Sequence, residues 1–204
     1  MENTRDKCRL RIRKNFEEVR GRNLEDLIKF ENPNEADIHV ITSQIKRKPS
    51  GEIFILARCP HGMPAVFLTI PEDLTGGPIP PPLWLSCPFA SRVIAGLESD
   101  GYVSVFSSKL GDKALREKFS GEEIEYASFL RSLLSKHASK RVRFAFDGKG
   151  VSGGKIGSIK CLHAHTAYAL STGCERGMIG RWCIEKVGGE ENLWCAGKDE
   201  ACFN

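Results

Sequence analysis

The sequence contains no long hydrophobic run, no strong charge of either sign and no recognisable catalytic signature. No stretch approaches the roughly 18 consecutive apolar residues that a membrane span requires. Residues 1–7 also lack the apolar core of a secretory signal. These absences argue against a membrane or secreted protein, and they predict a soluble protein of the cytoplasm.

The weak net charge narrows the choice of partner. The formal charge is +4, whereas a nucleic-acid surface normally shows a stronger basic cluster. Residues 5–22 are rich in Lys and Arg, but Glu17 and Glu18 interrupt them and aromatic residues are few. That pattern is typical of a solvated helix face. We therefore expect a protein or an anionic small molecule as the partner, rather than nucleic acid or a membrane.

Cysteine, by contrast, is plentiful, with eight residues in a chain of 204. Cytoplasmic thiols are kept reduced, so this number indicates metal or redox chemistry more than a disulfide framework. With 41% apolar residues the chain can bury the core of one domain. We divide it into a charged N-terminal extension (1–33), a core domain (34–181) and a cysteine-bearing C-terminal tail (182–204).

Apolar runs between turn residues predict a small, mostly antiparallel sheet. Strands are expected at 52–57, 65–70 and 83–86, and residues 141–146 alternate like a further edge strand. Apolar residues at helical spacing predict helices at 34–48, 122–137 and 156–171, whereas residues 102–110 fit either state. The predicted fold class is α+β, a single domain whose helices cover the sheet.

Three short segments each place a thiol at the edge of an apolar run: Arg58-Cys59-Pro60-His61-Gly62, Ser86-Cys87-Pro88 and Lys160-Cys161-Leu162-His163-Ala164-His165. On one helix, Cys161 and His165 share a face, and with Cys59 and Cys87 they could form a tetrahedral Cys₃His zinc site. If His163 is the ligand instead, the helix must begin late, close to the metal. His61 lies at the tip of the hairpin beside Cys59 and is a third histidine candidate.

The spacing does not choose between these ligand sets, and an iron–sulfur cluster is the alternative cofactor. Without a metal, the three cysteines would be small buried hydrophobic residues. Cys161 with His163 or His165 could also form a nucleophile and its base, but the sequence shows no oxyanion site to accompany them.

Two further groups are candidates for binding. Four cysteines near the C-terminus could form a second metal site, although their spacings are wide: Cys174, Cys183, Cys195 and Cys202. The glycine-rich loop at 147–157 could bind an anion in front of the last helix, through Lys149, Gly153, Gly154 and Lys155. It departs from the phosphate-loop pattern, because Ile156 follows Lys155.

The short motifs resemble those of a bacterial family, the domain of unknown function numbered 501. The resemblance covers about residues 37 to 181 and rests on the three cysteine segments, on Arg92…Gly96-Leu97-Glu98…Gly101 and on Ala169-Leu170. The family has no assigned activity. Its genes often lie beside a cell-division initiator and an exopolyphosphatase-type phosphatase, which implies a phosphate-linked or division-linked role. Some relatives carry histidine in place of Cys87, an exchange that suits zinc better than a cluster.

Two classes of function follow from these observations. The first is a metal-binding protein that acts through a partner. The second is a small enzyme that acts on a phosphorylated or otherwise anionic substrate, through the metal or the glycine-rich loop. The sequence offers no recognisable base, nucleophile pair or carboxylate-rich metal site, which favours the first class.

Overall fold

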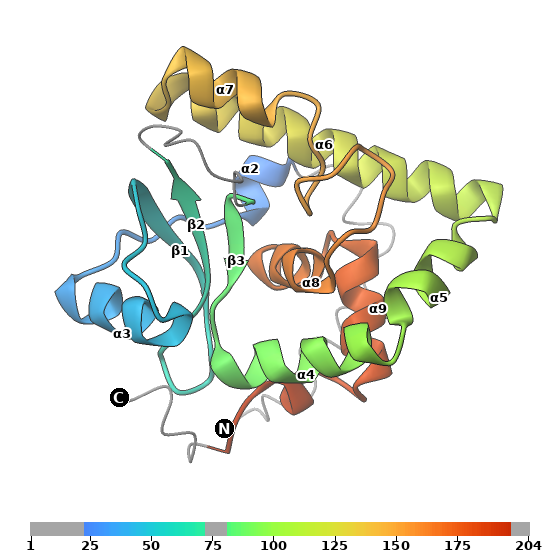
Figure 1. The fold of residues 1–204 in the computed structure, drawn as a ribbon, viewed down its shortest axis with the longest axis horizontal. Coiled ribbons are helices and arrows are strands. Elements are labelled where there is room, and N and C mark those ends of the chain that lie inside the picture. Colours follow the sequence, from blue (N-terminus) through green and yellow to red (C-terminus); the bar gives the residue numbers. More distant parts are fainter. Residues whose placement is uncertain (1–22, 72–80, 197–204) are drawn as a thin grey trace.

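A three-stranded antiparallel sheet lies to one side of the computed structural model, which describes residues 23–71 and 81–196 (Figure 1). The strand order is β1-β2-β3, with β1 at Glu52–Arg58, β2 at Pro64–Ile70 and β3 at Leu83–Leu85. Helices pack around this sheet, which confirms the predicted α+β class. Within the described ranges, none of the helices is both long and apolar enough to cross a membrane.

The two faces of the sheet bury different sets of side chains, because successive residues of a strand point to opposite sides. Ile55, Phe67 and Trp84 are paired across the sheet and pack with Ile41 of helix α3 (Glu35–Ile45). Their neighbours along the strands face the larger core on the other side, with Phe54, Leu56, Val66, Leu68, Leu83 and Leu85 among them. The short helix α2 (Leu24–Leu27) contributes Leu24 to this core.

Helix α4 (Pro88–Ser99) begins where β3 ends, with Cys87 as its N-cap residue and Pro88 in its first turn. Proline suits that position because the first helical N–H has no partner within the helix. Helix α5 (Tyr102–Lys109) and the long helix α6 (Lys113–His137) follow. The ambiguous segment at 102–110 is therefore helical, and the predicted helix at 122–137 is the second half of α6.

The edge strand expected at 141–146 is wrong, because Lys140–Phe146 forms helix α7. Ser139 caps this helix by accepting a hydrogen bond from the N–H of Val142 at 3.3 Å. Val142 and Phe146 are buried, whereas Phe144 is 85% exposed. Val142 and Phe146 are four residues apart and lie on one helix face, and these apolar positions also fit the alternation that suggested a strand.

Helix α8 (Leu162–Ser171) occupies the middle of the molecule, and nine of its ten residues are buried. The predicted start of this helix at residue 156 is wrong. The N–H of Gly157 contacts Glu123 of α6, and Cys161 has an extended backbone at the N-cap, so the helix begins only at Leu162. Helix α9 (Met178–Lys186) packs against α8 so closely that a Cβ on Gly180 would lie 2.1 Å from the carbonyl oxygen of His165. The predicted boundary at 181/182 falls inside α9, and a 3-10 turn, η3 (Glu190–Leu193), follows.

Candidate metal centre

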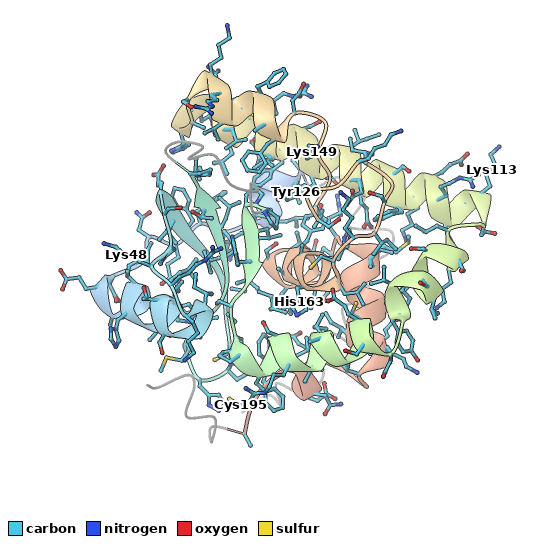
Figure 2. The ribbon with its side chains drawn as sticks, in the orientation of Figure 1. Lys48, Lys113, Tyr126, Lys149, His163 and Cys195 are labelled. Atoms are coloured by element: carbon cyan, nitrogen blue, oxygen red, sulfur yellow. The ribbon has the colours of Figure 1, made fainter. Side chains whose placement is uncertain are left out.

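The structure divides the predicted zinc ligands into two groups. Cys161 and His163 lie at the start of α8, and Figure 2 places His163 between α8 and α4. Cys59 and Cys87 lie instead at the end of the sheet where α4 begins. His165 belongs to neither group, because it is buried against α6. The prediction that Cys161 and His165 share a helix face is therefore wrong. The helix begins at Leu162, after Cys161, and this is the late start that a His163 ligand requires.

Glu98, Cys161 and His163 form a cluster in which one ligand atom from each residue lies within 4.8 Å of the others. The Nδ1 atom of His163 is 3.8 Å from the Cys161 sulfur and 3.2 Å from Oε1 of Glu98. With ordinary zinc bond lengths, a tetrahedral ion holds N and S about 3.6 Å apart, and N and O about 3.3 Å apart. The cluster matches these separations to within a few tenths of an ångström.

Hydrogen bonds fix two of these three side chains. The Nε2 atom of His163 lies 3.0 Å from the carbonyl oxygen of Ser91, one turn into α4. Oε1 of Glu98 accepts a hydrogen bond of 2.6 Å from the backbone N–H of Leu162, the first residue of α8. Metal-binding histidines usually donate their second ring N–H to such an acceptor, which sets the tautomer and leaves the other nitrogen free to bind.

The electrostatics of the cluster are those of a cation site. Contact with Cys161 raises the pKa of His163 to about 9, and the charge of Glu98 raises it as well, although burial opposes both. Two acidic groups thus surround a position that favours positive charge. A divalent cation with thiolate, imidazole and carboxylate ligands satisfies the same preference, and this donor set suits zinc.

The same geometry argues against a nucleophile and base pair. In a catalytic triad, the nucleophile and the orienting carboxylate lie at opposite nitrogens of the imidazole ring. Here the sulfur of Cys161 and the carboxylate of Glu98 both approach Nδ1, while Nε2 faces a backbone carbonyl. The arrangement therefore fits chelation better than proton abstraction.

Cys183 of α9 lies behind this cluster and is fully buried. Burial raises the pKa of its thiol to about 12; Glu98 and Cys161 also raise it, whereas the hydroxyl of Thr166 lowers it. The other tail cysteines lie elsewhere. Cys174 follows the far end of α8, Cys195 lies beside the β1–β2 hairpin, and Cys202 is outside the described residues.

The glycine-rich loop does contact an acidic group, but that group is a carboxyl of the protein itself. Glu123 of α6 is buried, and its Oε1 accepts a hydrogen bond of 3.2 Å from the N–H of Val151. The N–H of Gly157 also favours the charged form of Glu123. A Cβ on Gly150 would lie 1.7 Å from Oε2 of Glu123, so only glycine fits at this position of the loop.

The predicted anion site is therefore not in front of the last helix. The backbones of Lys149 and Lys155 form an isolated antiparallel β-bridge, and the N–H of Gly153 donates a hydrogen bond to the carbonyl of Gly150. Gly154 contributes its carbonyl to a bond from the N–H of Gly150. Because α8 begins only at Leu162, its N-terminus faces Glu98 and not this loop.

His165 joins Glu123 in the interior. Its Nδ1 lies 3.9 Å from Oε1 of Glu123, and burial lowers the pKa of the imidazole to about 3, so that the ring is neutral. Among the described residues, Nε2 of His165, Oε2 of Glu123 and the hydroxyl of Tyr126 have no hydrogen-bond partner. This buried polar set is separate from the Glu98 cluster.

The sequence prediction missed Glu98, which supplies the third ligand atom. A signal was present, because Glu98 belongs to the Gly96-Leu97-Glu98 motif that carries part of the family resemblance. Its position near the end of α4, which packs on α8, could not be read from the spacing, because 62 residues separate Glu98 from Cys161 in the chain.

Comparison with known proteins confirms the family resemblance. A family profile described as "Protein of unknown function (DUF501)" matches residues 55–185, a range that includes Glu98, Cys161 and His163. No curated protein matches the chain, and no solved structure does. The matched range is well over half of the sequence, and the chain therefore belongs to the DUF501 family of proteins of unknown function.

Proposed function

We propose that this protein binds a zinc ion through Glu98, Cys161 and His163. The observation that carries the proposal is the close approach of the three ligand atoms, together with the bond that ties Nε2 of His163 to a backbone carbonyl. Three protein ligands leave one tetrahedral position for water or for an atom of a substrate, an arrangement common in catalytic zinc sites.

The exposure of the ligands supports an accessible ion. The side chains of His163 and Glu98 are 27% and 30% exposed, whereas closed structural sites are usually shielded from solvent. A zinc-bound water at this position would be acidic enough to act near neutral pH. Hydrolysis of a phosphorylated or other anionic substrate is therefore the second candidate function, and it rests on this open position rather than on the glycine-rich loop.

Elemental analysis of the purified full-length protein tests the metal. We expect Cys161→Ser and His163→Gln each to lose one equivalent of zinc, whereas His39→Gln, at an exposed histidine of α3, should keep the wild-type content. Equal zinc content in all three variants would contradict the site. Replacement of zinc by cobalt(II) then tests the open position, because phosphate that binds the ion must alter the visible spectrum of the metal.

A further inference from the structure

Positive charge is concentrated in the second half of helix α6 and in helix α7. Residues 126–146 contain no Asp or Glu and five Lys or Arg residues, namely Arg131, Lys136, Lys140, Arg141 and Arg143. The formal charge of this segment, +5, exceeds the +4 of the whole chain, so the remaining residues together carry −1. The small net charge of the chain therefore conceals a strongly basic region.

The five basic side chains are exposed, and acidic neighbours neutralise only part of their charge. Arg131 pairs with Asp147, with Nη2 and Oδ1 2.9 Å apart. In the part of the chain that the structure describes, no ion pair involves Lys136, Lys140 or Arg143. The end of α6 and α7 thus present uncompensated positive charge to solvent.

Two of these residues lie where their charge opposes the stability of α7. Lys140 and Arg141 are in the first turn of the helix, directly after its N-cap Ser139, and this turn contains no acidic residue. The N-terminus of a helix carries partial positive charge, so acidic side chains stabilise it and basic ones do not. A local choice that disfavours the fold is typical of a functional surface.

Phe144 lies among these charges with its ring in solvent. It is 85% exposed, whereas Val142 and Phe146 on the other face of α7 are buried. Lys140 and Arg141 precede it by four and three residues and therefore lie on the same side of the helix. A single exposed apolar residue is common on protein surfaces, but one enclosed by basic groups fits a partner that is both anionic and apolar.

An anionic lipid bilayer has both of these properties. Lysine and arginine on a surface helix bind anionic headgroups, while a phenylalanine beside them enters the boundary of the acyl chains. Such contact stays in the headgroup region and requires no membrane-spanning helix. Single-stranded nucleic acid is anionic too, but proteins usually hold it in a groove lined by several aromatic side chains. Phe144 is instead the single exposed aromatic residue of α7, which lies at the outer edge of the molecule (Figure 1).

We propose that the α7 surface docks the protein reversibly onto an anionic lipid bilayer. This surface consists of Lys136, Lys140, Arg141, Arg143 and Phe144. Figure 1 shows α7 and α4 on opposite sides of α8, so a bilayer against α7 leaves the Glu98 cluster open to solvent. The docking does not depend on zinc, and Cys161→Ser should bind vesicles as the wild type does. Weaker vesicle binding by Cys161→Ser would contradict this independence.

Co-sedimentation of the full-length protein with vesicles tests the proposal. We expect binding to phosphatidylcholine vesicles that contain about 30% phosphatidylglycerol, and no binding to phosphatidylcholine alone. Salt at about 0.5 M should release the protein, because it screens the charges. Failure to bind the anionic vesicles would overturn the proposal.

Paired variants assign the binding to α7. Lys140→Gln/Arg143→Gln should weaken it about thirtyfold, since each basic residue near the lipid contributes a factor of about five. Lys48→Gln/Lys113→Gln is the matched control, because it removes the same charge from exposed lysines that Figure 2 shows far from α7. Equal losses in the two pairs would reduce the effect to net charge and overturn the proposal. Wild-type binding by the α7 pair would also overturn it, because the basic residues 5–22 would then hold the lipid.

The aromatic ring is tested separately. Phe144→Ser should weaken binding about tenfold by removing the apolar contact. Val105→Ser, at a residue of α5 that is 44% exposed, is its control and should bind as the wild type does. Equal binding by both variants would refute the insertion of Phe144. Binding of a thymidine oligonucleotide that the α7 pair abolishes, without binding to vesicles, would overturn the lipid in favour of nucleic acid.

An acidic replacement separates docking from a structural role. Lys140→Glu should weaken vesicle binding more than Lys140→Gln does, and it should not lower the unfolding temperature, because an acidic group suits the first turn of a helix. A lower unfolding temperature would show that Lys140 serves the fold, and it would overturn its assignment to the α7 surface.

Discussion

Replacement of Glu123 by glutamine should make the stability of the protein less sensitive to pH. Burial raises the pKa of Glu123 to about 7 from 4.5, and Glu122 raises it as well, whereas the N–H groups of Val151 and Gly157 lower it. The neutral His165 ring and Tyr126 are its other polar neighbours. Glutamine has nearly the same shape and stays neutral, so it imitates the protonated acid.

The sign follows from the proton balance. Between pH 4.5 and 7, folded Glu123 holds a proton that the unfolded chain has released, so the free energy of unfolding falls as pH rises. This contribution is fully present below the unfolded value of 4.5 and is lost as pH passes through 7. A shift of this size, at about 1.4 kcal/mol per pH unit, corresponds to about 3 kcal/mol.

Urea unfolding between pH 4 and 8 measures the effect. The stability of Glu123→Gln minus that of the wild type should increase by about 3 kcal/mol across this range. Glu117→Gln, on an exposed side chain of the same helix, is the matched control and should change stability little, because water surrounds the group in both states. A difference between Glu123→Gln and wild type that is constant with pH would refute the reasoning.

Three other substitutions, one of them with a control, test the packing of the fold, all by urea or thermal unfolding. Gly150→Ala should destabilise by about 1–3 kcal/mol, since its Cβ meets a buried carboxylate, whereas Gly121→Ala in open space on α6 should stabilise by up to about 1 kcal/mol; equal effects would contradict the clash. Arg58→Met should cost about 2 kcal/mol, because it removes the ion-pair partner of the buried carboxylate of Asp37. Leu193→Ala should cost about 2–5 kcal/mol; a loss below 1 kcal/mol would show that the C-terminal segment is not part of the core.

The sheet could be predicted from the sequence because its information is local. Each strand is a short apolar run between turn residues, and the five-residue connection from Cys59 to Met63 permits only a hairpin. The prediction of a strand at 141–146 was wrong because it also used local information alone. Six alternating residues cannot distinguish a strand from a short helix with one buried face, and the cap at Ser139 decides between them.

The site was only partly predictable, because its geometry depends on where a helix begins. Moving the start of α8 from residue 156 to Leu162 takes Cys161 out of the helix and changes which histidine it meets. The glycine-rich loop misled for a related reason. Its N–H groups do point at an acidic side chain, but the sequence could not show that this side chain is Glu123, about thirty residues earlier in the chain.

Burial of α8 on all sides has a consequence for how the Glu98 cluster moves. A helix enclosed by the sheet, α4, α6 and α9 cannot open alone, so its amide protons should exchange with solvent only when the whole core unfolds. Cys161 and His163 sit at the first turn of that helix, and Glu98 is bonded to its first N–H. The cluster is thus as rigid as the core itself, so an arriving ion would find its ligands already in place and lose little affinity to ordering them.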